Sequence, residues 1–109
     1  IDEAAYGPEH PEVATAVNNL GLVLRALGDL AGARAAFERA LRLDEAVYGP
    51  EHPKVATDVN NLGSVLKDQG DLAGARKAYE RALRILEKTL PPEHPHIRIV
   101  RENLEANHE

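Results

Sequence analysis

The stretch NNLGLVLRALGDLAGARAAFERAL occupies residues 18–41, and a close copy, NNLGSVLKDQGDLAGARKAYERAL, occupies residues 60–83. The two copies are offset by 42 residues. When residues 1–42 are aligned with residues 43–84, roughly 32 of the pairs are identical, which is the similarity expected between units of a repeat protein. A third, partial unit begins at Ile85. The chain is therefore predicted to be an array of similar structural units.

Within each unit the apolar residues follow a helical period. Val13, Val17, Leu20 and Leu24 are separated by four, three and four residues, and the same spacing recurs in the second copy. Another apolar stripe covers residues 30–41 and its copy. Between the stripes stands Gly-Asp, a pair in which Gly can end one helix in a left-handed conformation and Asp can cap the next. Each unit is predicted to be two antiparallel helices joined by a tight turn.

The hexapeptide YGPEHP at residues 6–11 and 48–53, with a diverged copy, LPPEHP, at residues 90–95, is predicted to connect one unit to the next. Gly permits the exit from a helix and the following Pro prevents its continuation. The second Pro suits the first position of a new helix, where no N–H is needed. The expected helices cover about residues 11–27, 30–48, 53–69, 72–89 and 95–107.

The spacing of residues that the two units share resembles that of tetratricopeptide repeats. A large residue is followed by Leu-Gly, Leu, Gly, Ala, an aromatic residue and Ala, represented here by Val17/Val59, Leu20-Gly21/Leu62-Gly63, Leu24/Leu66, Gly28/Gly70, Ala33/Ala75, Phe37/Tyr79 and Ala40/Ala82. The usual repeat has 34 residues, and the longer unit with its Gly-Pro-Glu-His-Pro turn resembles the 42-residue kinesin-light-chain-like variety. A period near 42 also occurs in HEAT repeats, but the Leu-Gly, Gly-Asp and Ala spacing argues against them. The expected fold is an all-α solenoid of antiparallel helix pairs with about five helices.

The expected organisation is a single array over residues 1–109. Residues 1–10 would be the tail of a preceding repeat and its turn, residues 11–52 and 53–94 two repeats, and residues 95–109 a C-terminal capping helix. The cap is inferred because Arg98, Arg101 and Glu105 replace small or apolar residues of the earlier units. The first helix would keep an uncovered apolar side, through which we expect self-association.

Composition and charge narrow the classes of function. The formal net charge is −5 and no basic run is present, which argues against a nucleic-acid ligand. The chain has no cysteine, as is typical of proteins in a reducing compartment, and no stretch with the length and hydrophobicity of a membrane span. A cytoplasmic protein is expected, with no cofactor and no membrane association.

The resemblance implies that the first helices of the units line a concave groove that binds a partner peptide or helix. The positions carried over are Thr15, Asn18, Asn19, Leu22, Arg25 and Ala26, then Thr57, Asn60, Asn61, Ser64, Lys67 and Asp68, and finally Ile99, Glu102, Asn103 and Ala106. Asn is a poor helix former, yet Asn pairs stand mid-helix, and an amide can bind a peptide backbone. Alternatively, these amides bond to the neighbouring unit and fix the stacking.

No catalytic or metal-binding constellation is found. The recurring His10, His52 and His94 are interpreted as turn residues, because equivalent positions of successive units stand too far apart to share one ion. The leading hypothesis is a non-enzymatic protein–protein interaction scaffold. The alternatives are a regulatory or self-assembly segment of a larger signalling protein, for example an NTPase-linked one, or an idealised repeat protein without a natural ligand.

Overall fold

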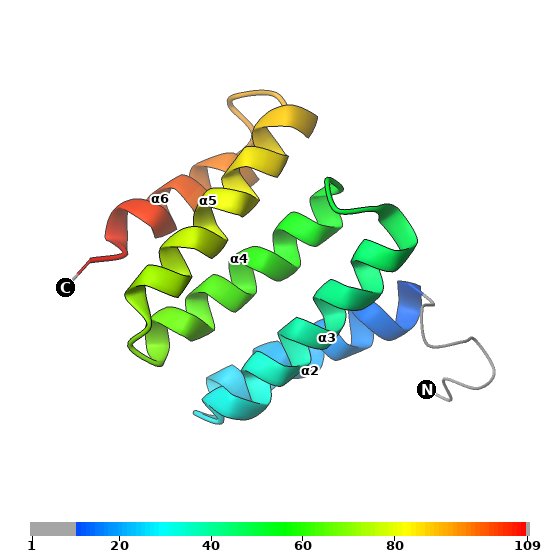
Figure 1. The fold of residues 1–109 in the computed structure, drawn as a ribbon, viewed down its shortest axis with the longest axis vertical. Helices are drawn as coiled ribbons and strands as arrows, with labels where there is room; N and C mark the ends of the chain where they lie inside the picture. The colour runs from blue at the N-terminus through cyan, green and yellow to red at the C-terminus, as the bar shows by residue number, and fades with distance from the viewer. Residues whose placement is uncertain (1–10, 109) are drawn as a thin grey trace.

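The computed structural model describes residues 11–108, which form five helices and no strand (Figure 1). The helices are α2 (Pro11–Ala26), α3 (Leu30–Tyr48), α4 (Pro53–Asp68), α5 (Leu72–Thr89) and α6 (Pro95–Ala106). Each helix packs on the next one along the chain, and α2 also touches α4, as in a helical solenoid. The predicted all-α fold is confirmed, with three helices ending one residue earlier than expected. The tail predicted at residues 1–10, with its His10, and residue 109 lie outside the described residues.

Small residues let the two helices of a unit approach closely. A Cβ atom built on Gly21 of α2 would lie 2.6 Å from Cε1 of Phe37 on α3, and one on Gly63 of α4 would lie 2.9 Å from Cε1 of Tyr79 on α5. Both rings are buried, so they have little room to move. Glycine is therefore required in the first helix because the aromatic ring of the second helix occupies the space of a side chain.

The turns within the units have the predicted chemistry. Gly28 and Gly70 have φ angles of 86° and 88°, a region that favours glycine. The side chain of Asp29 accepts a hydrogen bond from the N–H of Gly32 at 2.9 Å, and Asp71 accepts one from Gly74 at the same distance. These capping bonds fix the points at which α3 and α5 begin.

The turns between units use histidine as a helix cap. Nδ1 of His52 accepts a hydrogen bond from the N–H of Lys54 at 3.0 Å, and Nδ1 of His94 accepts one from His96 at 3.1 Å. The proline that follows each of these histidines begins the helix. In the described part of the chain, the recurring histidines thus act as turn residues, as their position predicts.

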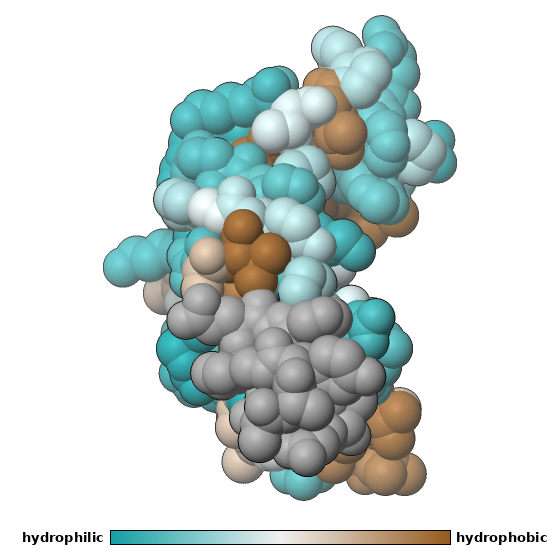
Figure 2. Space-filling view, turned by 90° about the vertical axis from the view of Figure 1, so that its right-hand side faces the viewer, coloured by the Kyte–Doolittle hydropathy of each residue, from teal (hydrophilic) through white to brown (hydrophobic). Residues whose placement is uncertain are grey.

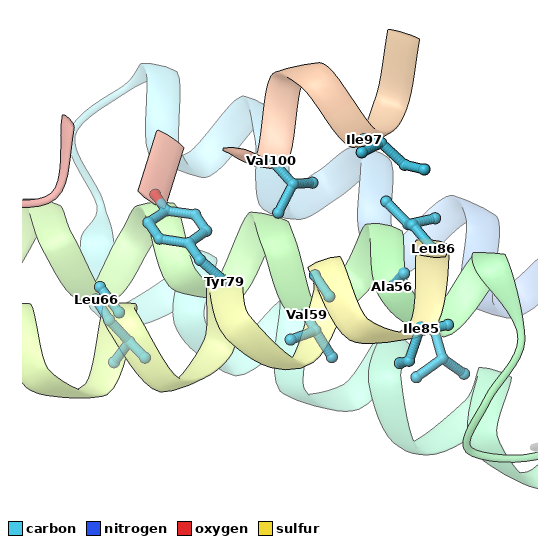
Figure 3. Close-up of a cluster of buried hydrophobic side chains, with 11 residues drawn as sticks. Ala56, Val59, Leu66, Tyr79, Ile85, Leu86, Ile97 and Val100 are labelled. Atoms are coloured by element: carbon cyan, nitrogen blue, oxygen red, sulfur yellow. The ribbon is translucent and has the colours of Figure 1, made fainter. Parts of the chain in front are cut away.

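The core follows the helix pairs. The largest cluster joins α4, α5 and α6, and Figure 3 shows Tyr79, Ile85 and Leu86 of α5 facing side chains of α4 and α6. Smaller clusters lie between α2 and α3 and around Phe37, which packs with Val65 of α4. The side chain of Phe37 therefore connects the first unit to the second.

One side of α2 carries exposed apolar residues. Leu20, Val23 and Leu27 have exposed fractions of 52%, 55% and 76%. Val65 of α4, the counterpart of Val23, is fully buried, because α3 covers that side of α4. Figure 2 shows hydrophobic groups at the lower end of the molecule, the end at which α2 and α3 meet in Figure 1.

Candidate functional site

The predicted groove residues share one face, formed by α2, α4 and α6, which we call the groove face. Three pockets along it bring some of these residues together, whereas Asn19, Asn61, Ser64, Lys67 and Asn103 line none of the three. One pocket lies between α2 and α4 and includes Thr15, Asn18 and Thr57 in its lining. Another lies between α4 and α6 and includes Thr57, Asn60 and Ile99. The third is bordered by Leu22, Arg25, Ala26 and Asp68.

The asparagines form hydrogen bonds between neighbouring units. Nδ2 of Asn61 donates to Oδ1 of Asn18 at 3.0 Å, and Nδ2 of Asn103 donates to Oδ1 of Asn60 at 3.1 Å. These bonds connect α2 to α4 and α4 to α6, so four of the predicted site residues take part in the stacking of the units. Asn19, which occupies the same position of its unit as Asn61, is exposed.

Charged residues connect the C-terminal ends of the same three helices. Nε of Arg25 lies 2.6 Å from Oδ2 of Asp68, and this hydrogen bond raises the pKa of Arg25. Nζ of Lys67 donates to the carbonyl oxygen of Ala106 at 3.0 Å. Both basic side chains of the predicted groove therefore already have protein partners.

The hydroxyl residues differ in their availability. The hydroxyls of Thr15 and Thr57 donate only within their own helices, to the carbonyl oxygens of Pro11 and Pro53, and both residues are exposed. Ser64 is half-buried, with its Oγ 2.9 Å from the hydroxyl oxygen of Tyr79. The threonines consequently present free surface on the groove face, whereas Ser64 serves the packing of α4 on α5.

Two buried carboxyl groups lie beneath the groove face, and sequence reasoning missed them. Asp44 of α3 and Asp58 of α4 are 5% and 2% exposed, and both border the pocket between α2 and α4. Burial, together with the nearby carboxyl of Asp44, raises the pKa of Asp58 to about 9. No N–H group among residues 11–108 bonds to Asp58 Oδ2. The pair therefore holds a proton at neutral pH, and the two carboxyl groups are each other's partners.

The described residues show no grouping of three His, Cys, Asp or Glu side chains that could hold a metal ion. Between residues 11 and 108 no helix combines the length and the hydrophobicity that a bilayer span requires.

Comparison with known proteins agrees with this geometry. A family model described as tetratricopeptide repeat matches residues 1–46 and 12–88, which together cover most of the chain. The chain belongs to the tetratricopeptide repeat family. Proteins built of these repeats typically are non-enzymatic scaffolds, and tetratricopeptide domains generally bind protein partners.

A solved structure of BtubC (BKLC) from P. vanneervenii superposes on this tetratricopeptide array with a TM-score of 0.88 and 28% sequence identity. The superposition covers 96% of this chain and 42% of BtubC, so the array spans less than half of that protein's length. This similarity supports the kinesin-light-chain-like variety of the repeat. A search of curated protein sequences gives no significant match.

Proposed function

We propose that the groove face of α2, α4 and α6 binds an extended segment of a partner protein. The observation that supports this most directly is the row of pockets along one face, each containing at least one residue that packing leaves exposed. Thr57 is shared by two of these pockets, so two side chains of one ligand could occupy both of them.

The groove face offers the mixture of groups that peptide binding needs. Leu22 and Ile99 are large apolar residues that are 43% and 46% exposed, and they lie on different helices of the face. Contacts with such residues contribute binding free energy, while hydroxyl and amide groups between them orient a peptide backbone. The asparagine bonds between units hold these groups in register before a ligand arrives, which reduces the entropic cost of binding.

The test is a selection from a random peptide library, followed by fluorescence anisotropy with the selected peptides. We expect Thr57→Arg to weaken binding at least about tenfold, because the new side chain would fill the border of two pockets. Thr89→Arg is the matched control: Thr89 is also exposed, and its hydroxyl also donates to a carbonyl of its own helix, that of Ile85. Thr89 is absent from the lining of all three pockets. Peptides that bind both variants equally well would contradict the proposal.

Self-assembly is the second candidate function, and the exposed side of α2 favours it. Leu20, Val23 and Leu27 follow one another at helical spacing, so two copies of α2 could bury them against each other. Sedimentation velocity should then show a dimer at high concentration that Leu20→Ser with Val23→Ser converts to a monomer. A strict monomer of the unmodified protein at every concentration would remove this candidate.

A further inference from the structure

Two pockets of the groove face are built from the same seven positions of the repeat. The pocket between α2 and α4 is lined by Ala14, Thr15, Asn18, Asp44, Lys54, Thr57 and Asp58. The pocket between α4 and α6 is lined by Ala56, Thr57, Asn60, Leu86, His96, Ile99 and Val100. Every residue of the second set stands 42 positions after its counterpart in the first. The two pockets are therefore successive copies of one structural site, and a difference in their lining is a difference in what each can bind.

The buried residues beneath the two pockets have opposite chemistry. Asp44 and Asp58 lie beneath the first pocket, and their counterparts beneath the second are Leu86 and Val100. Leu86 and Val100 are each 3% exposed and pack in the apolar cluster of α4, α5 and α6, as Figure 3 shows. The fold accepts an apolar pair at these positions. The carboxyl pair is therefore not required by the packing of the repeat.

The first pocket offers no N–H donor to its buried acid. The hydrogen bond of the Asp58 carboxyl is the one to the carboxyl of Asp44, and no N–H group within residues 11–108 bonds to Asp58 Oδ2, although buried carboxyl oxygens normally accept such bonds. The charged groups that face Asp58 are Asp44 and Glu45 of α3 and Lys54 of its own helix. Glu45 is already paired with Arg81 at 2.8 Å, and Lys54 is an exposed residue that makes no ion pair with either aspartate in the structure. A ligand that brings N–H donors and a positive charge would satisfy this site.

Within the binding function proposed above, we propose that the two pockets distinguish the side chains of the bound segment. The pocket over Asp44 and Asp58 takes the ammonium or guanidinium group of a Lys or Arg side chain. The pocket over Leu86 and Val100 takes an apolar side chain.

The size and lining of the acidic pocket suit an organic cation. Its volume of about 130 Å³ is several times the roughly 30 Å³ share of a water molecule, and Ala14 gives it an apolar wall for an aliphatic stem. A divalent metal ion would find only two carboxylates here, and among the described residues no third acidic or histidine side chain is grouped with them. Hard cations such as Ca²⁺ take six or more oxygen ligands, many of them from carboxylates.

The repeat geometry sets the spacing of the two side chains. Neighbouring helices pack roughly 8–10 Å apart, and an extended peptide advances about 3.3 Å per residue. A segment lying across α2, α4 and α6 would therefore place a basic and an apolar residue about two or four positions apart, because only alternate side chains of an extended segment point to the same face. We expect peptides selected for binding to share this pattern.

The closing experiment titrates the protein at pH 7 with N-acetyl-lysine methylamide and with N-acetyl-norleucine methylamide, which has the same stem and no charge. Carbon-13 NMR of the aspartate side-chain carboxyls reports the site. The lysine probe should shift the Asp58 signal and lower the pH midpoint of its titration, while the norleucine probe leaves both unchanged. The Asp58→Asn variant should bind the lysine probe at least about tenfold more weakly, and the Glu93→Gln variant, which loses an exposed carboxylate outside the three pockets of the groove face, should bind it normally.

The outcomes separate this inference from the proposed function. If selected peptides bind the groove face but the lysine probe leaves the Asp58 signal unchanged, the cation pocket is refuted and the peptide site stands. If Mg²⁺, Ca²⁺ or Zn²⁺ alone produces the shift and the lysine probe does not, the pocket is a metal site and the inference is equally refuted. If the lysine probe binds at Asp58 and no peptide binds the face, the pocket stands and peptide binding fails.

Discussion

Replacing Phe37 with alanine is expected to lower the free energy of unfolding by about 3–5 kcal/mol. The ring is fully buried, it packs over Gly21 within its own unit, and it contacts Val65 of the following unit. Its removal would leave a cavity at the point where α2, α3 and α4 meet. Glycine at position 21 has no side chain to fill that space. For a domain of this size, the expected loss is a large fraction of the total stability.

Urea unfolding followed by circular dichroism measures this effect. Tyr48→Ala is the matched control, because Tyr48 is an aromatic residue of the same helix that is 37% exposed and stacks on His52 with 4.3 Å between ring centroids. We expect the control to cost on the order of 1 kcal/mol. If the two variants lost similar stability, Phe37 would not be the connection between the units.

Replacing Asp58 with asparagine is expected to stabilise the protein above neutral pH. Burial and the neighbouring Asp44 raise the pKa of Asp58 from its ordinary value of 3.8 to about 9. The folded protein therefore binds a proton here that the unfolded chain releases. Stability from this group is fully present below about pH 4 and is lost as the pH rises toward 9. Asparagine cannot ionise, so the variant should exceed the original protein by on the order of 2–4 kcal/mol at pH 8 and differ little at pH 4.

Thermal and urea unfolding at a series of pH values tests this dependence. The control is Glu93→Gln, which removes an exposed carboxyl of the turn before α6 and should leave the slope of stability against pH unchanged. The charged groups facing Asp58 are Asp44, Glu45 and Lys54, and Lys54 lowers the pKa of Asp58, so Lys54→Ala should raise that pKa further and extend the decline in stability to higher pH. If the stability of the Asp58→Asn variant declined with pH as that of the original protein does, a group other than Asp58 would bind the proton.

The fold could be predicted from the sequence because its determinants are local. The helical spacing of apolar residues, the Gly-Asp turn and the Gly-Pro-Glu-His-Pro connection each act over a few residues. Their repetition at a fixed interval then implies stacking. Gly21 and Phe37 were also identifiable, since a glycine in a helix interior costs stability unless a neighbour needs the space.

The candidate site was harder to predict from the sequence, because it depends on contacts between units. Asn18 and Asn61 are 43 residues apart, and only their placement on adjacent helices shows that their amides bind each other. A signal for the acidic pocket was nevertheless present. Asp58 lies on the apolar stripe of its helix, three residues after Val55 and four before Leu62, at a position where the first unit has Ala16 and the third has Val100. An acid that interrupts an apolar stripe in one unit alone indicates a local function.

The asparagine bonds between units have a direction, and this bears on how the array can evolve. In each pair, the later unit supplies the donor and the earlier unit supplies the acceptor. A whole unit has one asparagine that donates to the preceding unit and one that accepts from the following unit. A gene duplication that inserts 42 residues therefore adds both a donor and an acceptor. The number of units can thus grow or shrink while every internal amide keeps a partner, whereas the insertion of part of a unit would break the series.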